Sequence, residues 1–238
     1  MVTMRSWPLL AMSILAACSN DMTVYVRGGD RPPNPDFLFR SGGVAASSGL
    51  KVKGDVTVTR FQIVLRSMRL QEAPTSGVDG PGAQYFGPGP YLLDMPAASL
   101  AGGALTELIP KYVVGPKSYY EMDFVLQAVS PGDVALEPAL GPLQGKTFRI
   151  TGTNAHDVSF TFESAVTREL VRPSVYRLGT NHNNLVVNVA PDRWFALPDG
   201  TALDPTDPAA QQQIEENVAA SIDAYEDDNM DGIPDPLA

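Results

Sequence analysis

Residues 120–128 have the sequence Tyr-Glu-Met-Asp-Phe-Val-Leu-Gln-Ala, in which apolar and mostly polar side chains alternate. Successive side chains of a β-strand point to opposite faces. The alternation therefore predicts a strand that buries Tyr120, Met122, Phe124 and Leu126 and exposes its other face to water. A strand with one buried and one mostly solvated face is typical of an antiparallel sheet.

Further strand patterns occur on both sides of this segment. They cover residues 22–27, 55–70, 90–95, 146–151, 158–163 and 185–189. We expect the first to add an edge strand and the last, apolar on nearly both faces, to be a central strand. Residues 146–151 and 158–163 predict a hairpin. The regular spacing, without helical patterns in between, predicts an all-β fold, an antiparallel β-sandwich of the immunoglobulin-like or transthyretin-like type.

The composition agrees with many short strands. The 238 residues are 44% hydrophobic and 18% charged, with 21 Gly and 21 Pro. The formal net charge is −10, and the last basic residue, Arg193, is followed by eleven acidic ones. A basic footprint of the kind that binds nucleic acid is lacking, so we expect no nucleic-acid partner.

The chain begins with a short apolar run. Residues 7–17 are apolar apart from Ser13, follow one basic residue, Arg5, and end in Leu15-Ala16-Ala17 before Cys18, the single cysteine of the chain. About 20 apolar residues are needed to span a bilayer. The run is shorter than that and predicts a signal peptide over residues 1–17.

The four residues Leu15 to Cys18 resemble the lipobox of bacterial lipoproteins. This resemblance implies cleavage before Cys18 and acyl chains, palmitate among them, on its sulfur. Ser19 in the following position implies delivery to the outer membrane, with the protein on the periplasmic face or the cell surface. Residues 18–50, rich in Gly, Pro, Ser, Asn and Asp, are then expected to form a flexible tether between the lipidated cysteine and the folded body.

We expect the sandwich domain to span residues 51–198. Within it, Gly89-Pro90-Tyr91-Leu92-Leu93-Asp94 is followed by Gly115-Pro116-Lys117-Ser118-Tyr119 before the alternating strand. These two motifs resemble a family of bacterial lipoproteins with a β-sandwich domain of unknown function. The resemblance covers about Val56 to Phe195 and implies no catalytic residues.

Residues 199–238 form an acidic segment that predicts one amphipathic helix. Asp207 is a good N-cap residue and Pro208 suits the first helical position. An apolar stripe at helical spacing predicts a helix over residues 208–225 that packs on the sandwich; the stripe consists of Ile214, Val218, Ile222 and Tyr225.

The helix is followed by a pattern typical of a calcium loop. Asp227, Asn229 and Asp231 place side-chain oxygens at loop positions 1, 3 and 5, and Gly232 at position 6 permits a sharp turn. Ile233 would contribute its backbone carbonyl, and Asp235 lies at position 9. These five residues are the predicted metal ligands, and the expected cofactor is calcium.

This run resembles the calcium loops of EF-hand-like and thrombospondin type 3-like repeats. Position 12 is Ala238 instead of a bidentate Glu, and Glu226 or Asp223 would have to complete the shell from upstream. The expected affinity is therefore weak, on the order of 10⁻⁴ to 10⁻³ M, with a structural role for the ion. The alternative is a solvated acidic tail.

The sequence does not predict an enzyme. It contains no nucleophile elbow and no zinc-protease motif, and its two histidines, His156 and His182, are isolated. We expect a lipid-anchored cell-envelope protein whose sandwich binds an envelope protein or a glycan, or is structural. The alternatives are a hydrolase built around one of the histidines and a carbohydrate-binding module, whose candidate aromatic residues are Tyr85, Phe86, Tyr119, Trp194 and Phe195.

Overall fold

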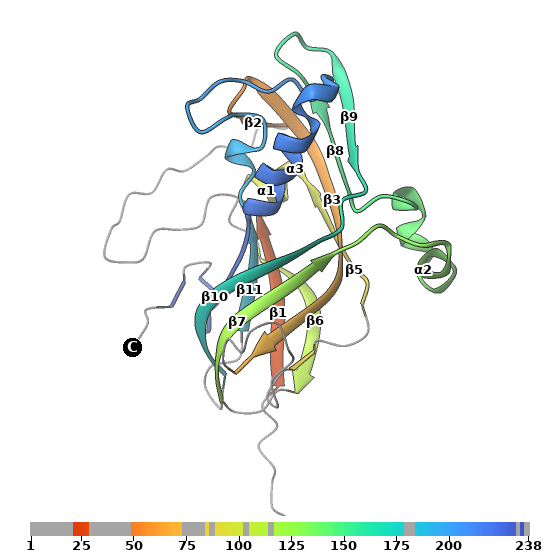
Figure 1. Cartoon of the computed structure of the whole chain (residues 1–238). Helices are drawn as coiled ribbons and strands as arrows, with labels where there is room; N and C mark the ends of the chain where they lie inside the picture. Colours follow the sequence, from red (N-terminus) through yellow and green to blue (C-terminus); the bar gives the residue numbers. More distant parts are fainter. Residues whose placement is uncertain are drawn as a thin grey trace, which may run out of the picture.

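The computed structural model describes residues 21–28, 49–72, 84–85, 89–101, 105–113, 117–178, 184–231 and 234–235. Over these residues the chain is mostly β-strand, and the strands form two sheets that face each other (Figure 1). The predicted all-β sandwich is therefore confirmed at the level of its architecture.

The larger sheet is organised by one long strand, β3 (Val56–Gln71). Its main strand order is β10-β7-β3-β8-β9, and three short strands also pair with β3. The bounds are β2 (Leu50–Val52), β4 (Gln84–Tyr85), β5 (Tyr91–Pro96), β7 (Lys117–Leu126), β8 (Phe148–Thr153), β9 (Ser159–Ser164) and β10 (Arg168–Leu178). The hairpin predicted around residues 152–157 is β8–β9.

The smaller sheet joins segments from both ends of the chain. Its order is β12-β11-β1-β6, with β1 (Asp21–Gly28), β6 (Thr106–Val113), β11 (Asn184–Val189) and β12 (Ile222–Glu226). The prediction of β11 as a central strand is confirmed. The prediction of residues 22–27 as an edge strand was wrong, because β1 lies between β6 and β11. The β1–β11 pair is also parallel, unlike the other described strand pairs.

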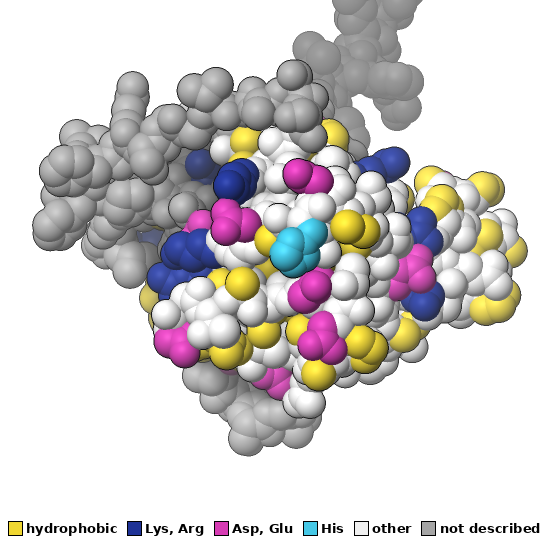
Figure 2. Space-filling model, turned by 90° about the horizontal axis from the view of Figure 1, so that it is seen from above, with side chains coloured by type: hydrophobic (Ala, Val, Ile, Leu, Met, Phe, Trp, Pro, Cys, Tyr) yellow, Lys and Arg dark blue, Asp and Glu magenta, His cyan; other side chains and the backbone are white. Residues whose placement is uncertain are grey.

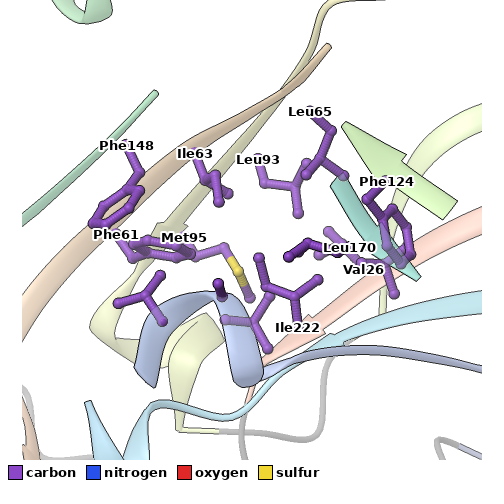
Figure 3. Packing of buried hydrophobic residues seen from close by; sticks show 14 of the residues in the cluster. Val26, Phe61, Ile63, Leu65, Leu93, Met95, Phe124, Phe148, Leu170 and Ile222 are labelled. Atoms are coloured by element: carbon purple, nitrogen blue, oxygen red, sulfur yellow. The ribbon is translucent and has the colours of Figure 1, made fainter. Parts of the chain in front are cut away.

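The hydrophobic core lies between the two sheets. Figure 3 shows side chains of β3 and β5 converging on side chains of β1 and β12, and residues such as Phe61, Ile63 and Ile222 are fully buried. Trp194, which follows the 3-10 turn η2 (Pro191–Arg193), packs against Phe61 with ring centroids 4.6 Å apart. Burial of such large rings contributes about 2–3 kcal/mol each relative to exposure.

One strand face differs from the prediction. Tyr119 is fully buried, whereas Tyr120 is 46% exposed. The pairing of β7 with β10 shifts between Pro173 and Tyr176, so that Tyr119 pairs with Tyr176, whose hydroxyl donates to the backbone of β12. A register irregularity exchanges the faces of the strand, and here it turns Tyr119 inward.

The acidic segment folds as a helix followed by a strand. Asp207 caps the helical segment by accepting the N–H of Ala209 (2.9 Å), and η3 (Pro208–Ala210) leads into α3 (Gln211–Ala220). Ile214 and Val218 are fully buried, so α3 packs on the sandwich as predicted. The predicted helical continuation to Tyr225 was wrong. The chain turns at Ser221, and residues 222–226 form β12, whose backbone groups are satisfied by pairing with β11.

Two short helical segments interrupt the strands. α1 (Ala97–Leu100) follows β5, and α2 (Pro131–Leu136) with the 3-10 helix η1 (Pro138–Leu143) projects from the body between β7 and β8 (Figure 1). Seen from above, this projection carries hydrophobic side chains on its outer surface (Figure 2). Leu136 is 86% exposed, whereas Leu140 and Leu143 at its base are buried against Val64.

Candidate functional site

The predicted calcium loop continues directly from strand β12. The Asp227 N–H donates to the carbonyl of Asn184 (3.1 Å), which extends the β11–β12 ladder by one residue. Asp227 is fully buried, although it is an aspartate. A buried carboxylate must be hydrogen-bonded or paired to offset the loss of solvation. Position 1 of the loop is thus held inside the fold.

The side-chain oxygens of the loop turn inward onto its own backbone. Oδ1 of Asp227 and Oδ1 of Asn229 both accept the N–H of Asp231, at 3.1 and 2.9 Å, and Asn229 Nδ2 donates to Asp231 Oδ2 at 3.2 Å. Met230 has a positive φ of 58°, which a non-glycine residue rarely adopts. The side-chain oxygens at positions 1 and 3 therefore both lie at the N–H of position 5.

The far end of the loop returns to its beginning. Asp235 Oδ2 accepts the N–H of Asp228 at 2.7 Å, and the Asp235 N–H donates to the carbonyl of Glu226 at 2.9 Å. Position 9 is thus adjacent to position 2. Ile233, the predicted carbonyl ligand, and Gly232 lie outside the described residues.

The body holds the loop from two strands. Asn184 of β11 donates its N–H to Asp228 Oδ1 (3.3 Å) and its side-chain amide to the Asp228 carbonyl (3.2 Å). The Tyr25 hydroxyl of β1 donates to the sulfur of Met230 at 3.7 Å. The sulfur contact is weak, but the two Asn184 bonds tie the loop to the smaller sheet.

The chemistry of the loop suits a hard cation. Its candidate ligands are carboxylate, amide and carbonyl oxygens, which calcium prefers, and calcium takes six to eight of them at about 2.3–2.6 Å. Within the described part of the chain, no three His, Cys, Asp or Glu side chains are grouped so that they could hold a metal ion. In the described loop, Asp227 and Asn229 accept the N–H of Asp231, and Asp235 accepts that of Asp228.

Cys18 and residues 1–17 lie outside the described residues. Lipidation of Cys18 therefore stays a prediction. No helix in the described ranges is long and apolar enough to cross a membrane.

The aromatic residues proposed for a glycan platform lie mostly in the core. Tyr119, Trp194 and Phe195 are fully buried. The Trp194 indole N–H donates to Ser221 Oγ (2.8 Å), and Phe195 packs edge-on against Phe160. These three side chains cannot form an exposed stacking surface; Phe86 and the side chain of Tyr85 are outside the described part of the chain.

The histidines give no catalytic arrangement in the described residues. His156 is exposed in the β8–β9 turn, where its N–H donates to Asn154 Oδ1 (3.0 Å). Hydrogen bonds from the N–H and the hydroxyl of Thr206 lower the pKa of Asp204. His182, the other candidate, lies outside the described residues.

The sequence pattern does not predict the buried charged cluster on the outer face of the larger sheet. Asp123 belongs to the strand face that is predicted to be solvated, but it is only 1% exposed and pairs with Arg69 of β3 (2.5 Å). Gln71 donates to Asp123 Oδ2 (2.8 Å) and to Glu121 Oε1 (3.2 Å). Arg69 and Gln71 alternate with apolar residues in β3, and Glu121 and Asp123 do so in β7. This shared pattern is the feature of the sequence that could have indicated polar side chains facing one another across the two strands.

One cavity of about 170 Å³ lies beside strands β5 and β6. Its lining includes Val26, Leu93, Met95, Ser99, Thr106 and Glu107. An apolar cavity of about 150 Å³ holds a molecule the size of benzene. The space is therefore enough for one small group, and its lining is partly polar.

In comparisons with known proteins, no protein-family model matches this chain, and no curated protein or solved structure matches it.

Proposed function

We propose that this chain is a lipid-anchored cell-envelope protein with a non-catalytic β-sandwich, and that calcium bound by residues 227–235 fastens its C-terminal strand. The observation that carries the calcium proposal is the buried Asp227, whose Oδ1 shares the N–H of Asp231 with Oδ1 of Asn229. This arrangement supports a cation at the centre of the loop, since it gathers side-chain oxygens around one turn.

The ion would stabilise one edge of the smaller sheet. Among the described strands, β12 pairs with one neighbour only, and the loop follows it directly. Where Asp227, Asp231 and Asp235 converge on the ion, their negative charges would repel one another, and a divalent cation would offset this repulsion. Because binding to the folded state alone shifts the folding equilibrium, calcium at about 1 mM, ten times a Kd of about 10⁻⁴ M, would add about 1.4 kcal/mol of stability.

The anchor in this proposal is Cys18. Each buried CH₂ contributes about 0.8 kcal/mol, so several acyl chains on one cysteine hold a protein on a leaflet without a further membrane-binding surface. A weak calcium affinity, as expected for this loop, would suit a compartment exposed to millimolar calcium. We also propose that the sandwich is of the immunoglobulin-like or transthyretin-like type. Its ligand in this proposal is an envelope protein or a glycan.

The calcium proposal is tested by thermal unfolding of the full chain in EGTA and in increasing calcium. We expect the melting temperature of the wild type to rise with calcium, and that of Asp231→Asn to rise much less, because the substitution removes one negative ligand. Glu216→Gln in α3 is the matched control outside the loop and should respond as the wild type does. A wild-type melting temperature that is indifferent to calcium would refute the calcium site.

The anchor is tested separately by labelling with palmitate in a bacterial host. The wild type should take up label and enter the membrane fraction, while Cys18→Ser should do neither. Equal labelling of the two chains would contradict the anchor and leave the calcium result unaffected.

A further inference from the structure

Two carboxyl groups meet on the outer face of strand β7. Glu121 and Asp123 are two residues apart, so their side chains share a face of the strand. Gln71, from the neighbouring strand β3, bridges them with its amide nitrogen, which lies 3.2 Å from Glu121 Oε1 and 2.8 Å from Asp123 Oδ2. The two carboxyl groups are also within hydrogen-bonding reach of one another.

One oxygen of this pair lacks a donor among the described residues. Asp123 is 1% exposed, and its Oδ2 accepts from Arg69 and Gln71, whereas its buried Oδ1 accepts from no described group. A buried acceptor without a donor is costly, and native proteins rarely keep one. A donor at this position would therefore stabilise the fold.

The neighbouring charges favour a proton as that donor. The described charged groups that face the pair are Arg69 from β3 and Glu169 from β10, which are hydrogen-bonded to each other at 2.8 Å. One guanidinium thus stands among three carboxyl groups. Two carboxylates that share a desolvated site do not both ionise readily, and one retains its proton.

We propose that Glu121 and Asp123 form a proton-binding site, in which the protonated carboxyl of Glu121 donates to Oδ1 of Asp123 at pH values where an ordinary glutamate is ionised. The proton satisfies the buried oxygen and removes one of the two adjacent negative charges. Gln71 then holds the two carboxyl groups in place from β3.

The electrostatics of Glu121 agree with this arrangement. Burial and then the negative charge of Asp123 raise the pKa of Glu121, and Arg69 opposes them less strongly. A carboxyl group whose pKa is higher in the folded than in the unfolded state binds its proton more tightly when folded. Its contribution to stability is therefore present at low pH and is lost as pH rises from the ordinary value through the raised one.

The test compares the full-length wild type with Glu121→Gln by thermal unfolding between about pH 4 and about pH 8, where carboxyl groups of normal and raised pKa titrate. The glutamine amide donates to Asp123 at every pH, so the variant should become more stable than the wild type as pH rises. At the upper end of this pH range the melting temperature of Glu121→Gln should exceed that of the wild type by about 2–4 °C. Glu216→Gln in α3, a glutamate outside the cluster, is the matched control and should keep the wild-type pH dependence.

Three outcomes would overturn the proposal. The first is a melting temperature that changes with pH equally in the wild type and in Glu121→Gln. The second is a rise in the melting temperature of the wild type, but not of Glu121→Gln, when sodium, magnesium or calcium is added at the upper end of the pH range. That result would show that the site binds a metal cation and not a proton. The third, which remains available if the variant does not fold, is a carboxyl carbon resonance of wild-type Glu121 that titrates at the ordinary glutamate value in NMR.

Discussion

At the scale of single residues, Asp133 shows how one carboxylate secures a projecting segment. Its side chain accepts from the N–H of Ser130 (2.8 Å), from the Ser130 hydroxyl (2.7 Å) and from Arg66 of β3. Arg66 first, and then the two Ser130 bonds, lower the pKa of Asp133 to about 2. The α2–η1 projection is therefore fixed to the larger sheet by a charged hydrogen-bond network.

Replacing this carboxylate should make the protein less stable near neutral pH. A group with a lowered pKa contributes stability above its unfolded pKa and loses it as pH falls through the folded value. We expect Asp133→Asn to lower the free energy of unfolding by about 1–2 kcal/mol at pH 7, a value that allows for the partial exposure of Arg66. The difference from the wild type should shrink between about pH 4 and about pH 2. Urea unfolding at each pH measures this, with Asp55→Asn, from an exposed pair with Lys51, as the control. A loss that is the same at every pH would contradict the electrostatic explanation.

At the scale of elements, the transition from helix α3 to strand β12 depends on a side chain of the opposite sheet. Arg172 of β10 donates to the carbonyl of Ala219 (2.7 Å) at the end of α3 and to that of Ile222 (2.5 Å) at the start of β12. Ser221, between them, donates to the Val218 carbonyl (2.7 Å). The last carbonyls of a helix have no partner within the helix, and here Arg172 and Ser221 supply the donors.

Loss of the Arg172 donors should weaken this junction selectively. We expect Arg172→Met, which keeps much of the apolar stem, to lower the free energy of unfolding by about 2 kcal/mol, because bonds from a charged donor to partly buried carbonyls are lost. Arg168→Met at the exposed start of β10 is the control, with an expected effect within about 0.5 kcal/mol. The measurement is urea unfolding at constant pH, and equal effects of the two substitutions would argue against a role for Arg172 in the junction.

At the scale of the whole molecule, both ends of the described chain belong to one sheet. β1, from the predicted tether, pairs with β11, and β12, from the acidic segment, pairs with β11 on its other side. Leu185, Val187 and Val189 of β11 are fully buried in the shared core. A chain limited to residues 51–198 would lack both strands that flank β11.

This arrangement predicts different results for two truncations. A chain that ends after residue 198 loses α3 and β12, exposes the apolar side of β11, and should fail to fold cooperatively. A chain that ends after Glu226 keeps β12 and lacks the calcium loop, so it should fold and show no calcium-dependent gain in melting temperature. Circular dichroism and thermal unfolding distinguish the two, and a cooperative transition in the shorter chain would show that the smaller sheet does not need β12.

The sequence alone was enough for features that depend on local chemistry. Period-two alternation indicated β7, β8 and β9, a short apolar run indicated β5, and a run apolar on nearly both faces indicated β11. The Asp207-Pro208 pair indicated the start of the C-terminal helical segment. The spacing of Asp227, Asn229 and Asp231 likewise indicated a local turn, in which Asp227 and Asn229 both accept the N–H of Asp231, whereas calcium binding there stays a prediction. In each case the residues that make the pattern are within a few positions of one another, so their geometry follows from the backbone they share.

Tertiary structure decided what depends on distant partners. Ile222 and Tyr225 fit a helical stripe as well as a strand, and pairing with β11 selected the strand. Asp123 fits a solvated face, yet Arg69 and Gln71 of β3 enclose it. The position of β1 inside its sheet depends on β6 and β11, more than 75 residues away. Alternation specifies that a strand has two faces, whereas the segments that cover those faces are chosen by the burial and hydrogen bonding of the complete fold.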